Sequence, residues 1–317
     1  MAAYDEQEYT KSFQLGIWKR LIPLLGNYRR DFALLLIFNL ASAVVDVALP
    51  LFQRYAIATF IEGDTLRGLL PYALCYLVAI LFQALFVVAF SRNAMYIEMS
   101  LGRDLRQKLF HHLQTLSLSF YNVTPVGYLI AREMSDTNRI ASMISWNLAD
   151  LLWALFYVLG TFGAMLVLNW RLALVILLIV PAIAILTGYF QGRILHWNRK
   201  VRKLNSKITG AFNEGITGAK TAKTLVIEEQ STGNFRRLTG EMHDSGVRAA
   251  RLSAVYIPLV LFCSSLAVAI VLLQGGTMVT EQVLEIATLA ACATYAGGVF
   301  EPMQCIATNL SEFMALQ

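Results

Sequence analysis

Four ionisable side chains lie within strongly apolar stretches of the sequence, where a charge is costly. Asp46, Asp150 and Glu301 are acidic, and Arg54 is basic. Ionisable groups at membrane depth usually face a polar cavity or pair with one another. Two roles follow: Asp46 and Glu301 could line a pathway for a solute, or Arg54 could form an ion pair with a carboxylate of a second subunit. Asp150 lies near a boundary, where its carboxylate could reach water.

Aromatic side chains recur in the same stretches and could line a cavity for an amphiphilic molecule. Packing and anchoring at the membrane interface are their commoner roles. Two of them, Tyr295 and Phe300, join Asp46 and Glu301 as the candidate substrate pathway. The full aromatic set is Tyr55, Tyr72, Tyr76, Phe82, Phe86, Tyr157, Tyr295 and Phe300.

The sequence predicts no catalytic residue and no metal site. His111 and His112 are adjacent, so on a helix they point about 100° apart and cannot readily share an ion. The segment GITGAKT, Gly215 to Thr221, is similar to a phosphate-binding loop only superficially, because lysine replaces its second glycine and no strand precedes it. The four cysteines fall in apolar stretches without a CxxC pair, which predicts free thiols. No cofactor is therefore expected in this chain.

Composition identifies the environment in which these residues act. Of the 317 residues, 57% are hydrophobic and 15% are charged, whereas soluble domains carry about 25% charged residues. This composition predicts an all-α membrane protein with six spans of about 20 residues each. The last span is the weakest, because it contains acidic residues and the Gly297–Gly298 pair. The predicted spans are 33–57, 69–90, 148–168, 172–190, 252–273 and 283–307.

The basic residues predict the orientation in the membrane. All lysines and arginines except Arg54, Arg67 and Arg171 precede the first span or lie in two long connections, residues 91–145 and 191–251. The positive-inside rule places these segments in the cytosol, which predicts a multi-pass cell-membrane protein with a cytosolic N-terminus. The net charge of +5 thus reflects topology and predicts no nucleic-acid partner. Residues 1–30 are expected to form a cytosolic or interfacial segment before a membrane domain at 31–317.

The two long connections have the pattern of helical hairpins. Apolar residues recur at helical spacing from Ile97 to Leu116, so the second span should continue into the cytosol as one helix of about 45 residues, or ~67 Å. Thr124 before Pro125 predicts a new helix start after a short cross-piece. In the second connection, Gly215 and Gly218 predict a cross-piece near Asn213–Thr221.

Three segments resemble the transmembrane domain of type I ATP-binding cassette (ABC) exporters. The stretch NWRLALVILLIVP is similar to the entry of their fourth span. Two further stretches, FYNVTPVGYLIAREMSDTNRI and NEGITGAKTAKTLVIEEQSTGNF, resemble their first and second intracellular loops. The resemblance covers essentially the whole chain. Its motif residues are Gly127, Leu129, Arg132 and Asp136 in the first loop, and Gly218, Lys223, Glu228 and Phe235 in the second.

This resemblance implies a half-transporter that pairs with a second half, identical or different, around a shared pathway. Short coupling helices at the hairpin tips would dock on nucleotide-binding domains. No Walker motif GxxxxGK[ST] occurs, so we expect those domains, with their ATP and Mg²⁺, outside residues 1–317. The implied coupling residues are Asn122, Thr124, Pro125, Val126, Gly127 and Tyr128 in the first loop, and Glu214, Gly215, Thr217, Gly218 and Lys220 in the second.

The resemblance leaves the transported substrate open: an amphiphilic drug, a lipid or a peptide would all suit it. The chain itself would supply the membrane part of an ATP-driven translocase, in contact with membrane lipid, and not the ATPase. Two other functions remain. An ion-coupled secondary transporter would need interrupted helices and ion sites within the membrane. A non-transporting regulatory module could use the same fold.

Overall fold

The computed structural model describes residues 26–124, 129–130 and 132–316, so most of the predicted N-terminal segment 1–30 lies outside the described residues. All regular secondary structure in the described part is helical, which confirms the predicted all-α class. Within the described residues, five helices are long and apolar enough to cross a membrane. The chain divides into two units, Met1–Val175 with Val268–Gln317 and Ile176–Ala267, which are described separately below.

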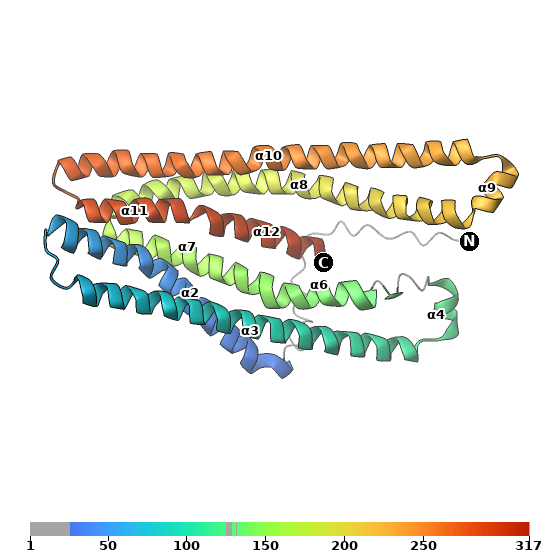
Figure 1. The fold of residues 1–317 in the computed structure, drawn as a ribbon, viewed down its shortest axis with the longest axis horizontal. Helices are drawn as coiled ribbons and strands as arrows, with labels where there is room; N and C mark the ends of the chain where they lie inside the picture. Colours follow the sequence, from blue (N-terminus) through green and yellow to red (C-terminus); the bar gives the residue numbers. More distant parts are fainter. Residues whose placement is uncertain (1–25, 125–128, 131, 317) are drawn as a thin grey trace. The chain divides into compact units, whose positions relative to one another are not determined.

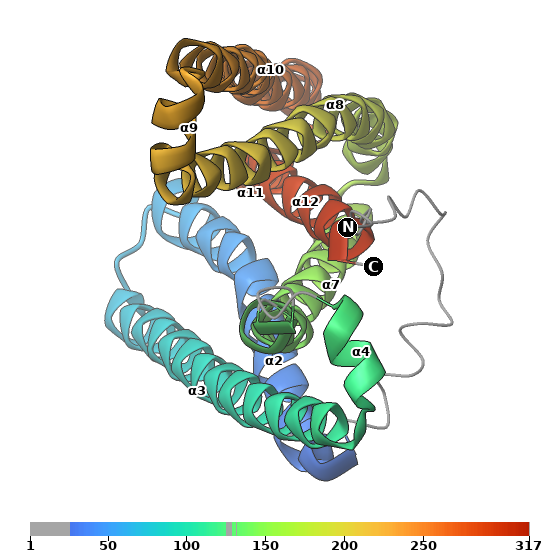
Figure 2. The same cartoon turned by 90° about the vertical axis from the view of Figure 1, so that its right-hand side faces the viewer.

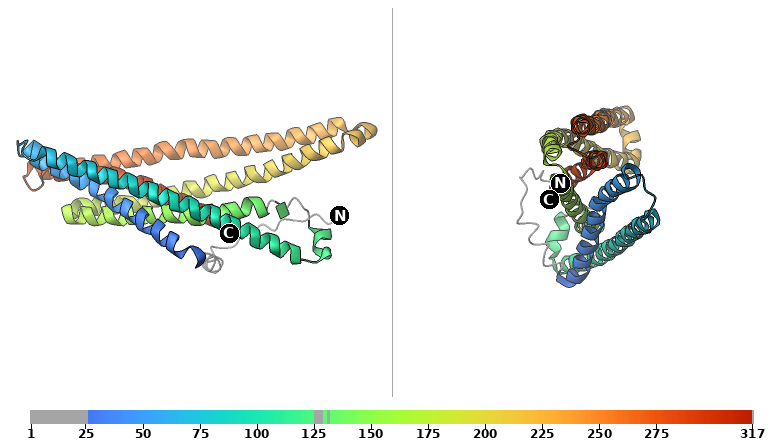
Figure 3. Two further views of the ribbon diagram at one scale, coloured as in Figure 1. Left: turned by 60° about the horizontal axis from the view of Figure 1, so that its bottom comes forward. Right: turned by 90° about the vertical axis from the view of Figure 1, so that its left-hand side faces the viewer.

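The first unit begins with two helices that pack side by side (Figure 1 and Figure 3). The helix α2 (Arg29–Ala56) continues as the π-helical segment η2 (Ile57–Glu62). The helix α3 (Leu69–Thr115) then runs for 47 residues, which confirms the predicted unbroken helix. Gly68 precedes it with a φ of 90°, a conformation that costs little only for glycine.

The return to the membrane is made of short helical pieces followed by one long helix. These are α4 (Leu118–Val123), η3 (Arg132–Asp136), α6 (Thr137–Ser142), η4 (Met143–Asn147) and α7 (Leu148–Leu168). The apolar stripe predicted on α3 is buried where this leg returns: Ile97 and Leu101 are at most 1% exposed, and Leu101 packs with Ala141 and Ile144. Nearer the tip the stripe is only partly buried.

The second unit is formed by the adjoining parts of α8 (Trp170–Thr217) and α10 (Glu228–Thr280), which α9 (Ala219–Leu225) connects (Figure 2). The buried residues of α10 in this unit recur at intervals of seven and four: Leu238, Ser245, Ala249, Tyr256, Val260 and Ala267. That spacing is typical of two helices packed along a narrow seam. The rings of Phe190 and Tyr256, from opposite helices, have centroids 5.7 Å apart.

The last predicted span is interrupted. It consists of α11 (Ile286–Gly298) and α12 (Phe300–Leu316), separated at Val299, so the single span predicted at 283–307 is not found as one helix. Consecutive glycines weaken a helix by roughly 1 kcal/mol each. Gly298 also has a packing role: a Cβ atom at this position would lie 2.6 Å from the Tyr157 hydroxyl oxygen. The helix α11 packs on α2, and α12 packs on α7.

Candidate functional site

The tip of the first hairpin is tied to the end of α3. The backbone leaves helical geometry at Leu116, and α4 begins at Leu118. The Tyr121 hydroxyl donates a hydrogen bond to the Leu113 carbonyl at 2.6 Å, which attaches α4 to the last turn of α3. Within α4, Leu118 is 82% exposed although it is strongly apolar.

The predicted coupling residues of the first loop lie at the end of this tip. Asn122 is an exposed residue of α4. Thr124 ends α4 in an extended conformation and is 6% exposed, with its N–H donating to the Phe120 carbonyl at 3.0 Å. The predicted residues Pro125, Val126, Gly127 and Tyr128 lie outside the described residues, and with them the predicted helix start. The observed cross-piece therefore begins four residues before Asn122.

The tip of the second hairpin begins later than predicted. Glu214, Gly215 and Thr217 form the last turn of α8, and the cross-piece α9 starts at Ala219. The predicted range Asn213–Thr221 is therefore displaced toward the N-terminus. A single glycine costs only about 1 kcal/mol within a helix, so Gly215 does not break α8. The break occurs at Gly218, where a Cβ atom would lie 2.8 Å from the Glu214 carbonyl oxygen.

Backbone bonds join α9 firmly to its neighbours. The Gly218 N–H donates to the Glu214 carbonyl, and the Gly218 carbonyl accepts from the Ala222 N–H, each at 2.8 Å. Lys220, the remaining predicted residue, lies in the first turn of α9. At its other end, Val226 has a φ of 53°, a conformation that is rare for a β-branched residue and carries a strain of order 1–3 kcal/mol.

The second tip also exposes apolar side chains. Val226 is 82% exposed, Ile216 63% and Leu225 62%. They lie at and just after the far end of the charged part of α8, whose rise from Arg193 to Thr217 is about 36 Å. Lipid cannot cover side chains so far from an apolar span, and a large exposed apolar patch marks an interaction surface. Ile216, Leu225 and Val226 are called the tip surface below.

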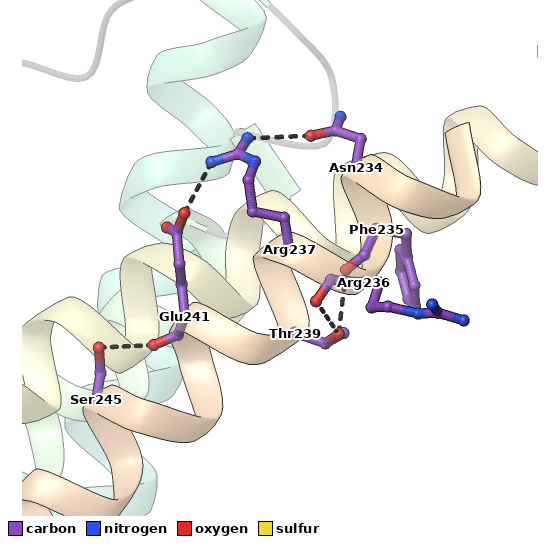
Figure 4. Close-up of polar contacts among 7 residues, drawn as sticks. All are labelled: Asn234, Phe235, Arg236, Arg237, Thr239, Glu241 and Ser245. Carbon is purple, nitrogen blue, oxygen red and sulfur yellow. Dashed lines mark hydrogen bonds and ion pairs between the residues drawn. The ribbon is translucent and has the colours of Figure 1, made fainter. Parts of the chain in front are cut away.

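The part of α10 that follows the tip carries a polar, solvated face. Arg237 donates to Glu241 at 2.7 Å and to Asn234 at 3.0 Å, all within one helix (Figure 4). Arg236 and Arg237 are both exposed, whereas Ser245 lies on the buried seam and donates its hydroxyl hydrogen to the Glu241 carbonyl of the same helix. These local contacts contrast with the apolar tip surface.

Asp46, the first candidate pathway residue, connects three helices. Its carboxylate accepts a hydrogen bond from the Gln83 amide of α3 and another, at 3.0 Å, from the Trp153 indole of α7. Asp46 is half-buried, whereas Glu301 at the start of α12 is exposed. The two carboxylates are near enough to interact electrostatically.

The two aromatic candidates are buried in the packing of α11 and α12. Tyr295 has no exposed surface, and its hydroxyl donates to the Val47 carbonyl of α2 at 2.5 Å. Phe300 is 7% exposed. Neither side chain therefore offers a free surface within this chain. Asp150, at the start of α7, is half-buried.

Arg54 forms an ion pair within the chain. Its guanidinium lies 3.2 Å from the Glu285 carboxylate and donates to the Thr288 hydroxyl at 2.9 Å. The pair thus links α2 to the start of α11, and the partner predicted from a second subunit is found in the same chain. Sequence reasoning missed Glu62, whose carboxylate accepts the Ala287 N–H at 3.1 Å. Glu62 lies in the short connection between the first two spans, and a carboxylate there can accept hydrogen bonds from the unsatisfied N–H groups at the start of a helix; this is the signal that could have identified it.

All four cysteines are free, as predicted. Among the described residues, no cluster of histidine, cysteine and carboxylate side chains has the geometry to hold a metal ion.

Comparison with known proteins identifies one protein family for this chain. The family described as "ABC transporter transmembrane region" matches residues 32–303. A relative from Bacillus subtilis, whose name assigns it provisionally to multidrug export as an ATP-binding and permease protein, is 25% identical over 95% of this chain and 53% of its own length. An ATP-dependent lipid A-core flippase of Colwellia psychrerythraea is 22% identical over 96% of this chain and 48% of its own length. The chain spans about half the length of these relatives.

Proposed function

Because the chain belongs to the family of ABC transporter transmembrane regions, we propose that it is the membrane-spanning half of an ATP-driven exporter that works as a dimer. Nucleotide-binding domains would drive it by pressing on the tip surface. Their closure on ATP would move α4 and α9, and the long helices would carry this movement to the spans. The half-transporters would thereby alternate between inward-open and outward-open states.

The tip surface is the observation that carries this proposal. Leu118 on α4 and Val226 beside α9 are each 82% exposed, so both hairpin ends present apolar side chains that need a protein partner. The charged parts of the two outgoing helices, from Arg92 to Thr115 in α3 and from Arg193 to Thr217 in α8, each rise about 35 Å. Each length is enough to carry its own hairpin tip well beyond a hydrocarbon core of ~30 Å.

The basic residues support a cytosolic position for both tips, since ATP is available there. On this orientation the ion pair between Arg54 and Glu285 lies toward the outer side of the membrane. There it would hold α2 to α11 until the pathway opens outward. The exposed Glu301 and the nearby Asp46 would then face the pathway from one side, and the second half-transporter would complete it.

The substrate is proposed to be amphiphilic. The named relatives are associated with multidrug export and with lipid A-core transfer. The exposed carboxylate of Glu301 favours a substrate that carries positive charge or hydrogen-bond donors, because opposite charges attract more strongly where the dielectric constant is low. Measuring the transport rates of cationic and neutral amphiphiles directly would show whether positively charged substrates are preferred.

An uncoupling experiment tests the role of the tip surface. Leu225→Asp with Val226→Asp in the complete transporter, ATPase domains included, places two charges on the surface that the partner should cover. We expect substrate-stimulated ATP hydrolysis and transport to fall at least about tenfold, since buried unpaired charges cost several kcal/mol. The matched control, Thr232→Asp with Gly240→Asp, adds the same charge at exposed positions of α10. Full stimulation in the tip variant, when both variants elute as the native assembly, would refute the coupling role.

One observation bears on the ion-coupled alternative. Secondary transporters typically place ion sites beside broken helices; the interruption at Val299 lies two residues from Glu301, but it is one residue long and keeps helical backbone angles. That mechanism gives the tip surface no role, so it ranks second. Uptake driven by an ion gradient in the complete absence of ATP would favour it.

A further inference from the structure

A pocket of about 430 Å³ opens on α8 at the point where the helix leaves its apolar stretch. It is lined by Tyr189, Gly192, Arg193, His196 and Trp197. Their spacing of three and four residues puts most of them on one face of the helix. Gly192 contributes to the opening, because a Cβ atom there would meet nothing within 4 Å.

One cation, Arg193, lines this pocket, and two more lie against its Trp197; each of the three rests on an aromatic ring. The Arg193 guanidinium lies over the Tyr189 ring, 5.1 Å from its centroid. The Trp197 ring contacts two more: the Lys200 ammonium at 5.3 Å and the Arg248 guanidinium of α10 at 4.9 Å. A cation on an aromatic face keeps its N–H donors available for a ligand.

These cations have no acidic partner in the part of the chain that the structure describes. None of the ion pairs there includes Arg193, Lys200 or Arg248. Arg193 therefore presents uncompensated positive charge in the pocket wall, and Lys200 and Arg248 add two more charges beside Trp197. Arginine forks match the oxygens of a phosphate group, and lysine adds a point charge.

The pocket lies at the level of lipid headgroups. Between Arg171 and Arg193 the helix α8 carries no charged residue, a length of about 31 Å, which matches a hydrocarbon core of ~30 Å. On α10, Arg248 lies one turn before Arg251, the last charged residue before the apolar stretch. Tyr189 and Trp197 are side chains that favour the membrane–water interface.

We propose that this pocket binds the phosphate headgroup of an anionic phospholipid of the leaflet that faces the basic connections. Arg193 and Arg248 would bind the phosphate oxygens, Lys200 would add charge, and Trp197 would hold the last two cations in position. The acyl chains would then lie along the apolar part of α8. A free phosphate ion offers the same headgroup chemistry without the chains, so the two sources can be separated by experiment.

Native mass spectrometry of the delipidated full-length protein tests this proposal. Phosphatidylglycerol is titrated in parallel with phosphatidylcholine, and bound lipids are counted. The site variant combines Arg193→Gln, Lys200→Gln and Arg248→Gln. The control removes the same charge from exposed positions of α8 through Arg199→Gln, Arg202→Gln and Lys207→Gln. We expect the site variant to bind phosphatidylglycerol on the order of a hundredfold more weakly, since each basic contact contributes about fivefold. The control should bind it as the wild type does.

A second variant separates a pocket from diffuse attraction. Gly192→Leu fills the opening, keeps every charge and raises helix propensity, so it should fold and yet lose the bound phosphatidylglycerol. Equal losses in the site and control variants would overturn the proposal, and so would full binding by Gly192→Leu. Displacement of the lipid by equimolar inorganic phosphate would assign the pocket to a soluble anion and also overturn it.

Discussion

Replacing Trp153 with phenylalanine removes the indole N–H that donates to Asp46 at 3.0 Å and leaves an aromatic ring near Tyr157, on which Trp153 stacks at 5.6 Å. A hydrogen bond to a charged group contributes about 1.5–3 kcal/mol. Asp46 keeps the donor on Gln83, so it is not left without a partner. We therefore expect a loss of stability within that range.

The measurement is thermal unfolding of the purified protein in detergent. At about 2–4 °C per kcal/mol, the change corresponds to a decrease of roughly 3–12 °C in Tm. A double-mutant cycle with Asp46→Ala, which removes the acceptor, isolates the pair, and we expect a coupling free energy above about 1 kcal/mol. Trp170→Phe is the matched control, because that ring is 58% exposed. Additive effects of the two changes would refute the idea that Asp46 ties the three helices together.

Two further predictions concern other contacts. Gly298→Ala places a methyl group 2.6 Å from the Tyr157 hydroxyl oxygen, so thermal unfolding should show a loss of stability of about 1–3 kcal/mol. Adding Tyr157→Phe removes that oxygen and should restore most of the lost stability. A double variant as unstable as Gly298→Ala alone would contradict this explanation. The Tyr28 hydroxyl donates a hydrogen bond to the Asp104 carboxylate at 2.7 Å, and this bond lowers the pKa of Asp104. The contact therefore stabilises the fold fully above the ordinary aspartate pKa of ~3.9, and this stabilisation is lost as the pH falls through the lowered pKa. The Tm difference between wild type and Tyr28→Phe should therefore be present at neutral pH and vanish in acid, and a difference independent of pH would contradict it.

The long helices could be predicted from the sequence because their signal is local. The apolar stripe from Ile97 to Leu116 and the absence of helix breakers predicted α3, which runs unbroken to Thr115. The weakness of the last span was also visible in Gly297–Gly298, and the structure interrupts the helix immediately after that pair.

The position of the second cross-piece could not be predicted as well, because two glycines competed. Gly215 and Gly218 have equal intrinsic helix propensity. The chain turns at Gly218, where a side chain would meet the Glu214 carbonyl oxygen. This clash is a property of the turned backbone and leaves no trace in the local pattern of residue types.

The side chains that bind Asp46 and Arg54 could not be predicted from the sequence for a different reason. Asp46 is 37 residues from Gln83 and 107 residues from Trp153, and Arg54 is 231 residues from Glu285. Each side chain was recognised as costly within an apolar stretch. Which donor satisfies it depends on how the helices pack, and that packing has no short-range signature.

Photo-crosslinking from the tip surface tests the central claim most directly. A photoreactive amino acid replaces Leu225, which is 62% exposed at the end of α9, in the complete transporter. The same amino acid at Gly240, an exposed position farther along α10, is the control. If the tip docks on an ATPase domain, position 225 forms an adduct with a peptide of that domain and position 240 does not. Absence of the adduct at 225, or equal adducts at both positions, would contradict the proposed coupling.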